Sequence, residues 1–343
     1  MNLYEQLADA LLPWYTSAHR QLPWRQTREP YKIWVSEIML QQTRVEAVRE
    51  YYSRFLEKLP NVESLAQADD DLLYKLWEGL GYYSRVRNLK KAAQVIMSDY
   101  DGQFPLEYAQ ILSLPGIGEY TAGAICSIAY DLPVPAVDGN VLRVIARITD
   151  DFTPIDKPSY KKLVREHLQM IYPKEAGLFT QALMELGATV CGPNRKPDCN
   201  ICPCKYFCKG QCHAEQLPVK LPKRLRRIEE KTVLILQCDG YYALTKRPDT
   251  GLLAGLWQFP DIAGLMSVDQ YVAEMERIGL KPKEILMQVE EKHVFTHVEW
   301  KMNGVYAVVS ERISDYVWLP LHRIRTEIAL PTAYRQFLNH IPE

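Results

Sequence analysis

The segment LPGIGEYTAGAI (114–125) places two glycines around one residue, directly before a run that is typical of a helix. Gly116 and Gly118 can adopt positive φ, which residues with a Cβ resist, so the segment predicts a tight turn. A turn of this kind at a helix start points successive backbone N–H groups outward and forms an anion site. Such a site binds a DNA phosphate without reading the base sequence, although a Gly-x-Gly on its own is more often an ordinary turn between helices.

The spacing of apolar residues changes along the chain. Up to about residue 190, segments such as LVREHLQMIY and AGAICSIAY repeat apolar residues every three or four positions, which predicts helices separated by Pro and Gly. From about residue 230, KTVLILQCDGYYALTKR contains two β-rich runs around Asp239-Gly240, which is a hairpin signal. HAEQLPVKLPKRLRR between them is typical of a linker. We expect three parts: a mainly α-helical domain with a cysteine-rich loop (1–213), a linker (214–229) and a small α+β domain (230–343).

Length and charge restrict the class of protein only loosely. The 343 residues carry a net charge of −1, so nucleic-acid binding would have to depend on local basic clusters such as SRVRNLKK (84–91) and KLPKRLRRIEEK (220–231), which could equally be solvated surfaces. The chain has no apolar run of the roughly 18 residues that cross a membrane, and its N-terminus lacks the pattern of a secretory signal. We therefore expect a cytoplasmic protein without membrane contact, nucleoid-associated if the source is bacterial.

The cysteines are crowded into one loop. Six of the eight lie between Cys191 and Cys212, whereas a secreted disulfide protein spreads them along the chain. Several thiolates so close together favour a metal site in a reducing compartment, and their spacing leaves zinc and an iron–sulfur cluster both open. The candidate ligands are Cys191, Cys199, Cys202 and Cys208.

Two carboxylates lie in apolar surroundings. Cleavage of a glycosidic bond needs an acid for the leaving group and an anion near the anomeric carbon. Glu37 in PYKIWVSEIMLQQT has apolar neighbours that would raise its pKa and suit it to donate a proton near pH 7; the alternative is a surface glutamate on an amphipathic helix. Asp138 in VPAVDGN ends an apolar stretch at a helix start, where N–H donors could keep it ionised, or it could simply cap that helix.

These motifs together resemble one family. LPGIGEYTAGAI followed by VDGNVLRVIAR, with Asp138 twenty residues after Gly118, is similar to the helix-hairpin-helix DNA glycosylase superfamily in its endonuclease III-like branch. PYKIWVSEIMLQQTRV resembles the adenine-specific glycosylases of the MutY type. The resemblance implies that Glu37 protonates adenine and that Asp138 stabilises the sugar cation or bonds to it transiently. It also implies that Tyr120 and Asn140 brace the aspartate.

Tyr120 indicates which reaction to expect. Members of the superfamily that also cut the backbone have a lysine at this place in the hairpin, where it forms an imine, and a phenol cannot do so. We expect a monofunctional adenine glycosylase that acts on adenine opposite 8-oxoguanine or guanine and leaves an abasic site. The alternatives are an endonuclease III-type pyrimidine glycosylase/lyase and a non-catalytic binder of damaged DNA.

The resemblance extends to the residues that open the duplex, because a base must leave the stack before its bond can be cut. By the family match, Gln42 in LQQT enters the helix beside the lesion and Tyr82 in GLGYYSR intercalates near the orphaned base. Arg85 and Arg87 would then meet phosphates, and Trp24 in LPWR lies near the adenine pocket. The expected partner is double-stranded DNA, bound by a monomer.

In the resembling family a [4Fe–4S] cluster is bound by four cysteines at spacing six, two, five. This chain has seven residues between Cys191 and Cys199, a change that a loop absorbs easily. Cys204 and Cys212 are additional to the pattern and are expected to be free thiols; the alternative is that one of them is a substitute ligand. Basic residues of the loop could touch the DNA backbone: Arg195, Lys196, Lys205 and Lys209.

The C-terminal part resembles the Nudix (MutT-like) fold through LTKRPDTGLLAGLWQFP. The following DIAGLMSVDQYVAEMERIGL lacks the glutamate pattern of a Nudix hydrolase, so we expect a binding module without hydrolase activity. The family uses this module to recognise 8-oxoguanine through a Phe-Ser-His loop. Here the loop is Phe295, Thr296 and His297, and threonine retains the hydroxyl.

Overall fold

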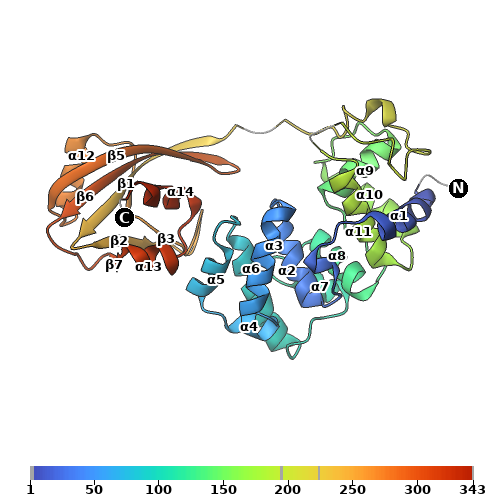
Figure 1. The fold of residues 1–343 in the computed structure, drawn as a ribbon, viewed down its shortest axis with the longest axis horizontal. Coiled ribbons are helices and arrows are strands. Elements are labelled where there is room, and N and C mark those ends of the chain that lie inside the picture. The colour runs from blue at the N-terminus through green and yellow to red at the C-terminus, as the bar shows by residue number, and fades with distance from the viewer. Residues whose placement is uncertain (1–3, 194–195, 223–224, 342–343) are drawn as a thin grey trace. The chain divides into compact units, whose positions relative to one another are not determined.

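The computed structural model describes residues 4–193, 196–222 and 225–341, so Arg195 of the cysteine-rich loop lies outside the described residues. Helices occupy the first two thirds of the chain (Figure 1): α1 (Glu5–Ala18), η1 (Pro23–Arg25), α2 (Pro30–Leu40), α3 (Val45–Lys58), α4 (Val62–Gln67), α5 (Asp70–Trp77), α6 (Ser84–Asp99), α7 (Tyr108–Ser113), α8 (Glu119–Tyr130), α9 (Gly139–Thr149), α10 (Pro158–Ile171), α11 (Ala176–Thr189) and η2 (Gln211–His213).

Strands and short helices make up the last third: β1 (Arg227–Cys238), β2 (Tyr241–Lys246), β3 (Trp257–Gln258), β4 (Asp261–Ala263), α12 (Val268–Arg277), β5 (Pro282–Val294), β6 (Val298–Val309), β7 (Val317–Pro320), α13 (Leu321–Thr326), α14 (Thr332–Arg335) and η3 (Gln336–His340). The helical and α+β halves expected from the sequence are confirmed. Within the described ranges, no helix is both long and apolar enough to cross a membrane.

Contacts divide the chain into two compact units, one of residues 1–67 and 87–222 and the other of residues 68–86 and 223–343. Helix α5 belongs to the second unit through direct bonds. Lys75 donates to the carbonyl oxygens of Arg325 and Ile328, at 3.1 and 3.0 Å. Glu78 accepts from the backbone N–H of Leu330 at 3.1 Å. The sequence boundaries 1–213, 214–229 and 230–343 remain predictions.

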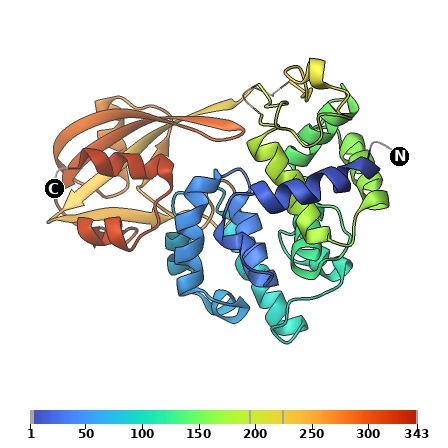
Figure 2. The ribbon, with the colours of Figure 1, turned by 45° about the vertical axis from the view of Figure 1, so that its right-hand side comes forward.

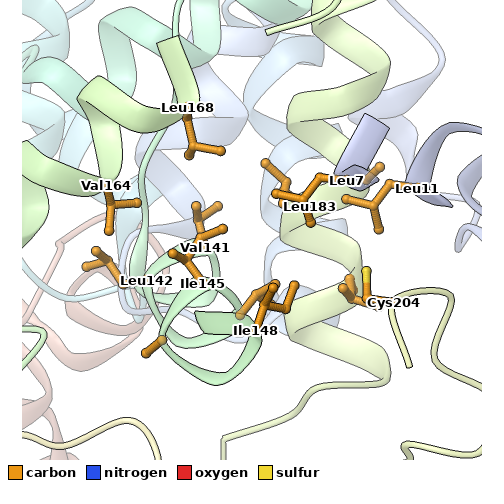
Figure 3. Close-up of a cluster of buried hydrophobic side chains, with 14 of the residues drawn as sticks. Leu7, Leu11, Val141, Leu142, Ile145, Ile148, Val164, Leu168, Leu183 and Cys204 are labelled. Carbon is orange, nitrogen blue, oxygen red and sulfur yellow. The ribbon is translucent and has the colours of Figure 1, made fainter. Parts of the chain in front are cut away.

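The core of the helical unit is built around α9. Its apolar residues recur at helical spacing and pack against α1, α10 and α11 (Figure 3), with Leu7, Val164 and Leu183 among their neighbours. Cys204 from the cysteine-rich loop is also fully buried in this cluster. The first turn of α9, which begins directly after Asp138, is therefore fixed by the packing of the helix behind it.

Helices α2 and α8 pack against each other beside this core. Proline at the first position of α2 starts the helix, since the first N–H has no helical partner in any case. In α8, a Cβ at Gly123 would lie 2.4 Å from the carbonyl oxygen of Pro135. Only glycine lets the stretch that leads to Asp138 approach α8 so closely.

The second unit contains one sheet in the order β3-β2-β1-β6-β5, with β4 paired to β1 and β7 to β2. β1 and β6 run parallel, and the other pairs are antiparallel. The β1–β2 connection is the predicted hairpin, with Asp239 and Gly240 at φ of 48° and 76°. In Figure 2, β5 and β6 form the long hairpin of this sheet.

Alternation along β1 explains how the sheet is covered on both faces. Val233 and Ile235 pack in one apolar cluster, which includes residues of α13, α14 and η3. Leu234 and Leu236 point to the opposite face and pack with Tyr271 and Met275 of α12. The period of two thus buries β1 on both faces, and its first residue, Arg227, donates its backbone N–H to the carbonyl of His297 in the loop that joins β5 to β6.

Candidate active site

A cleft of about 920 Å³ opens in the helical unit. Glu37 from α2, Tyr120 from α8 and Asp138 at the start of α9 all line it. Trp24, which is only 5% exposed, and Gln42 line it as well. Asn140 also lines the cleft, so the structure brings together six of the predicted site residues, including both carboxylates, which are separated by about a hundred positions in the sequence.

Glu37 has the environment of a proton donor. Its side chain is buried, with 5% exposure, and the Tyr120 hydroxyl donates a hydrogen bond to its Oε2. Burial raises the pKa of Glu37 to about 7, with a further increase from the nearby Asp138, while Tyr120 and Arg25 act in the opposite direction. A carboxyl group with this pKa is partly protonated at neutral pH and can act as a general acid.

Asp138 is the N-cap of α9. Its Oδ1 accepts from the backbone N–H of Val141 at 2.8 Å, and its Oδ2 accepts from Nδ2 of Asn140 at 2.6 Å. Burial raises the pKa of Asp138, and these donors together with Arg143 oppose the increase. The donors expected from the sequence are present, so Asp138 is the carboxylate of the pair that is better stabilised as an anion.

The two residues expected to brace Asp138 differ in their contacts. Asn140 bonds to Asp138, but the hydroxyl of Tyr120 bonds to Glu37 instead. Burial raises the pKa of Tyr120 well above its ordinary value, and the charges of both carboxylates add to this. Tyr120 is therefore a neutral donor between the two acids.

A buried ion cluster that the sequence analysis did not predict forms another part of the cleft wall. Glu185 of α11 is fully buried and accepts from Nη2 of Arg20 and Nη2 of Arg25, both at 2.7 Å. Burial alone would raise the pKa of Glu185, but the hydrogen bonds from the two arginines lower it to about 2. The one available signal was a glutamate within an apolar helix (LMELGA), the same signal that Glu37 shows.

Arg143 connects the start of α9 to the cysteine-rich loop. Its Nη2 donates to Oδ1 of Asn140 at 2.8 Å and to the carbonyl of Gly187 at 2.7 Å, and its Nε donates to the carbonyl of Cys191 at 2.8 Å. Asn140 is thus held on one side by Arg143 while it bonds to Asp138 on the other. The side chain that braces the aspartate is itself fixed by a nearly buried arginine.

The predicted turn before α8 is present, but only one of its glycines has the expected backbone. Gly116 has a φ of 77°, whereas Gly118 is extended at −102° and is the N-cap of α8. Both are exposed, and nothing lies within 4 Å of the place where a Cβ of Gly118 would be. The first N–H groups of α8 are open to an anion here.

Gln42 and Tyr82, the wedge residues predicted to enter the duplex, both have a backbone φ that is unusual for their residue type. Seven non-glycine residues with positive φ occur in the part of the chain that the structure describes; four are aspartates, and the others are Gln42 (58°), Tyr82 (46°) and Leu253 (57°). Side chains other than Asn and Asp rarely adopt this conformation, and strain of this kind gathers at functional sites. Tyr82 is 46% exposed. Arg87 is half-buried on α6, and Arg85 bonds to the turn that carries Tyr82.

The four predicted metal ligands line one small cavity of about 20 Å³: Cys191, Cys199, Cys202 and Cys208. Nη1 of Arg147 lies 3.2 Å from Sγ of Cys191, which suits a thiolate. Cys204 is not part of this cavity wall and packs in the core, and Cys212 is exposed. Four thiols that line one cavity beside a cation are the kind of donor set that a metal cluster needs. Leaving aside the residues without a description, no three His, Cys, Asp or Glu side chains are grouped closely enough to bind a single metal ion.

Comparisons with known proteins agree with this geometry. The family model described as HhH-GPD superfamily base excision DNA repair protein matches residues 35–174, and the NUDIX domain model matches residues 232–340. A Buchnera aphidicola (subsp. Baizongia pistaciae) protein named adenine DNA glycosylase is 34% identical, covering 96% of this chain and 95% of its own length. The chain belongs to the adenine DNA glycosylase family. The resemblance noted in the sequence is confirmed.

Another member of the adenine DNA glycosylase family and one solved structure match smaller shares of the chain. The Mus musculus adenine DNA glycosylase is 35% identical and matches 87% of this chain and 71% of its own length. The solved structure of a thermostable thymine-DNA glycosylase is 29% identical, with a TM-score of 0.55 over 62% of this chain and 97% of that one. The HhH-GPD match contains Glu37, Tyr120 and Asp138.

The predicted recognition loop of this adenine DNA glycosylase family member lies in its NUDIX domain, between β5 and β6. Phe295 is half-buried, its ring centroid 4.8 Å from that of Trp300, whereas Thr296 and His297 are exposed. The hydroxyls of Thr296 and Tyr82 lie 2.6 Å apart within the second compact unit. The loop predicted to recognise 8-oxoguanine and the tyrosine predicted to intercalate beside the orphaned base are therefore neighbours.

Proposed function

We propose that this chain hydrolyses the N-glycosidic bond of adenine paired with 8-oxoguanine or guanine in double-stranded DNA and leaves an abasic site. The observation that carries the proposal is the pair of carboxylates in one cleft. There, burial raises the pKa of Glu37, and Asp138 accepts hydrogen bonds from backbone and side-chain donors at a helix start. Environments that separate two carboxylates in this way assign an acid and an anion.

Glu37 supplies the proton. The extruded adenine enters the cleft, and the protonated Glu37 donates to a ring nitrogen, so the base leaves as a neutral molecule. The Tyr120 hydroxyl then stabilises the carboxylate that Glu37 becomes, because it donates to Oε2. The proton donor is thus held in one orientation before and after transfer.

Asp138 supports the positive charge that develops on the sugar as the bond to adenine breaks. Its carboxylate is aimed by Asn140 and by the N–H of Val141, so little reorganisation is needed when the charge forms. Water completes the hydrolysis at the anomeric carbon. The product is a free base and an abasic deoxyribose.

Tyr120 is the reason for proposing a monofunctional enzyme. Its hydroxyl bonds to Glu37 and its pKa lies well above its ordinary value, and a phenol forms no imine with the opened sugar. A glycosylase/lyase would instead yield a stable covalent DNA adduct with borohydride. We expect no such adduct in an amount comparable to adenine released.

The remaining predicted residues are proposed to bind the DNA, with the protein acting as a monomer. The exposed N–H groups at Gly116 and Gly118 receive a phosphate, as does Arg87, and Trp24 borders the adenine. Gln42 and Tyr82 enter the duplex, while the loop of Phe295, Thr296 and His297 reads the opposite base. These contacts place the duplex so that adenine rather than its partner is extruded.

We further propose that Cys191, Cys199, Cys202 and Cys208 bind a [4Fe–4S] cluster. When bound, the cluster cross-links four points of a loop that has little secondary structure of its own. Arg147 and Arg143 donate to this loop at Cys191, so the loop is anchored to α9 and hence to the Asp138 end of the cleft.

Single-turnover release of adenine from a duplex containing one adenine opposite 8-oxoguanine tests the proposal. Wild-type protein with its metal loaded should release adenine, and Asp138→Asn should lower the rate by roughly a hundredfold or more. Asparagine caps helices as well as aspartate does, so α9 and duplex binding should be retained. No release by the loaded wild-type protein would refute the proposal, and an equal loss of binding and release in the variant would give Asp138 a purely structural role.

A further inference from the structure

The turn between α5 and α6 has a strained backbone. Gly79 and Gly81 have φ values of 101° and 69°, and Tyr82 follows at 46°. Glycine adopts such angles freely, but a tyrosine in the left-handed region costs about 1 kcal/mol or more. The Tyr82 hydroxyl lies 2.6 Å from that of Thr296, but the side chain is 46% exposed, so burial contributes little to keeping the backbone there. Other contacts must stabilise the turn.

Arg85 supplies these contacts. Its Nη2 donates to the carbonyl oxygens of Leu80 at 2.9 Å and Gly81 at 3.1 Å, and its backbone N–H donates to the carbonyl of Tyr82 at 2.9 Å. Nε1 of Trp77 donates to the same Gly81 carbonyl at 3.1 Å. Arg85 therefore donates to all three carbonyls of the stretch 80–82, and Trp77 adds a second bond to that of Gly81.

The guanidinium of Arg85 also lies between two aromatic rings. Its central carbon is 5.4 Å from the centre of the Trp77 ring and 5.5 Å from that of Tyr82. Both distances fall in the range of cation–π attraction. Trp77 is fully buried, so the charged group is packed against the interior of the unit on one side and against the Tyr82 ring on the other.

The charge of Arg85 is partly removed from water by this packing. Burial lowers the pKa of Arg85 to about 10, which still leaves it charged at neutral pH. A guanidinium whose donors are directed at main-chain carbonyls is poorly placed to bind a DNA phosphate, which is the role that the sequence suggested for it. Both bonds come from Nη2 at one end of the planar guanidinium fork, whose two N–H groups can each reach one of two acceptors that lie side by side.

We propose that Arg85 is a positioning residue that holds the strained turn and so presents Tyr82 to the DNA, rather than a ligand of a phosphate. This inference rests on the proposed function, because it assumes that Tyr82 enters the duplex. A turn fixed before binding spares the complex the entropy of ordering Tyr82. Loss of Arg85 should therefore act through Tyr82 and leave the number of ionic contacts with DNA unchanged.

Arg85 and Arg87 form a matched pair of arginines at the start of α6, and Arg85 is the one whose bonds to the carbonyls of the turn are described above. We would measure adenine release and the salt dependence of duplex binding for Arg85→Met, Arg87→Met, Tyr82→Ala and the double variant with Arg85→Met and Tyr82→Ala. We expect Arg85→Met to slow release roughly tenfold, as for the loss of a charged hydrogen bond. The double variant should be no slower than Tyr82→Ala, with the wild-type salt slope kept.

A phosphate contact would give the opposite pattern. The salt slope of Arg85→Met would fall by about 0.9, as expected for Arg87→Met, and its effect would multiply with that of Tyr82→Ala; that result would overturn the inference. Arg85→Lys separates the two roles again if Arg85→Met does not fold. Lysine keeps the charge but loses the fork, so it should remain impaired if Arg85 positions the turn and recover if Arg85 binds a phosphate.

Hydrogen exchange of DNA-free protein gives a readout that does not depend on catalysis. The amide of Arg85, bonded to the carbonyl of Tyr82, should exchange faster in Arg85→Met than in wild-type protein, with no comparable change in Arg87→Met. Unchanged exchange would overturn the inference even if adenine is released. If wild-type protein releases no adenine but exchange is faster in Arg85→Met, the proposed function is refuted while the role of Arg85 in holding the turn stands.

Discussion

At the scale of single residues, the site depends on two carboxylates that share a cleft but differ in their partners. Glu37 is one of the buried residues of α2 and accepts a hydrogen bond from the Tyr120 hydroxyl. Asp138 instead accepts from the backbone N–H groups at the start of a helix. The same burial therefore raises the pKa of Glu37 to about 7 while the anion of Asp138 is better compensated. One carboxyl is left to hold a proton and the other to hold a charge.

This difference predicts the pH dependence of kcat/KM for adenine release. Activity should fall as pH rises through about 7, because Glu37 loses the proton that it donates, and it should fall on the acid side as Asp138 becomes protonated. Tyr120→Phe removes a hydrogen bond that stabilises ionised Glu37, so the alkaline limb should move to higher pH. A pH–rate profile of both proteins checks this, and a limb that stays in place or moves to lower pH would contradict the assignment.

The raised pKa of Glu37 also has a cost in stability. Its ordinary value is 4.5 and its folded value is about 7, so between these pH values the unfolded chain gives up a proton that the folded protein retains. The free energy of unfolding is therefore highest below pH 4.5 as far as this group is concerned, and it declines as pH rises to about 7. Glu37→Gln cannot ionise and should be more stable than wild type by on the order of 2 kcal/mol at pH 8, with a smaller gain at pH 5. Urea unfolding at the two pH values measures the difference; a gain that shrinks with pH would contradict it.

At the scale of helices and loops, the sequence predicts features that depend on nearby residues better than contacts between residues far apart in the chain. The helix that starts after Asp138 and the turn at Gly116 follow from caps and glycines within a few residues, and both are present. The extended backbone of Gly118 was not foreseen, because a glycine permits positive φ without requiring it. The bond of Tyr120 to Glu37 joins residues 83 positions apart, so only the packing of α8 against α2 could establish it. The same holds for Arg25 and Glu185, which are separated by 160 positions.

The cysteine-rich loop allows a prediction by position. Cys199 lines the four-cysteine cavity, whereas Cys212 is exposed outside it. We expect Cys199→Ser to lose bound iron and visible absorbance and Cys212→Ser to retain both. Removing the iron with a chelator should make the loop 191–208 of the wild-type protein more sensitive to protease, because a metal that cross-links a loop stabilises its fold. Metal analysis also decides between iron and zinc, and zinc in the purified protein, or iron kept by Cys199→Ser, would contradict the proposed cluster.

At the scale of the whole molecule, the cleft proposed to be catalytic lies in one compact unit and the loop proposed to read the opposite base lies in the other. The stretch 68–86 carries the predicted wedge Tyr82, yet its contacts place it in the same unit as the NUDIX domain. Linear order along the chain cannot reveal this, since the bonds from Lys75 and Glu78 reach residues about 250 positions away. Under the proposed function, reading of the opposite base and entry into the duplex fall to neighbouring side chains of one unit, Thr296 and Tyr82.

This division of labour predicts a change of preference rather than a general loss of rate when the loop is altered. Thr296 and His297 are exposed at the tip of the β5–β6 connection, far in sequence from both carboxylates, so substitutions there should leave the chemistry of the cleft intact. Thr296→Val removes the hydroxyl at nearly constant volume, and His297→Ala removes the imidazole. Each should lower the ratio of the adenine release rates opposite 8-oxoguanine and opposite guanine by roughly fivefold, the effect of one lost hydrogen bond.

Thr296→Ser should keep the ratio, and His322→Ala serves as a matched control because His322 is an exposed histidine on α13 of the same unit. An unchanged ratio in both Thr296→Val and His297→Ala, measured with the two duplexes side by side, would show that the loop does not read the opposite base, and an equal loss on both duplexes would make its contribution one of general DNA binding.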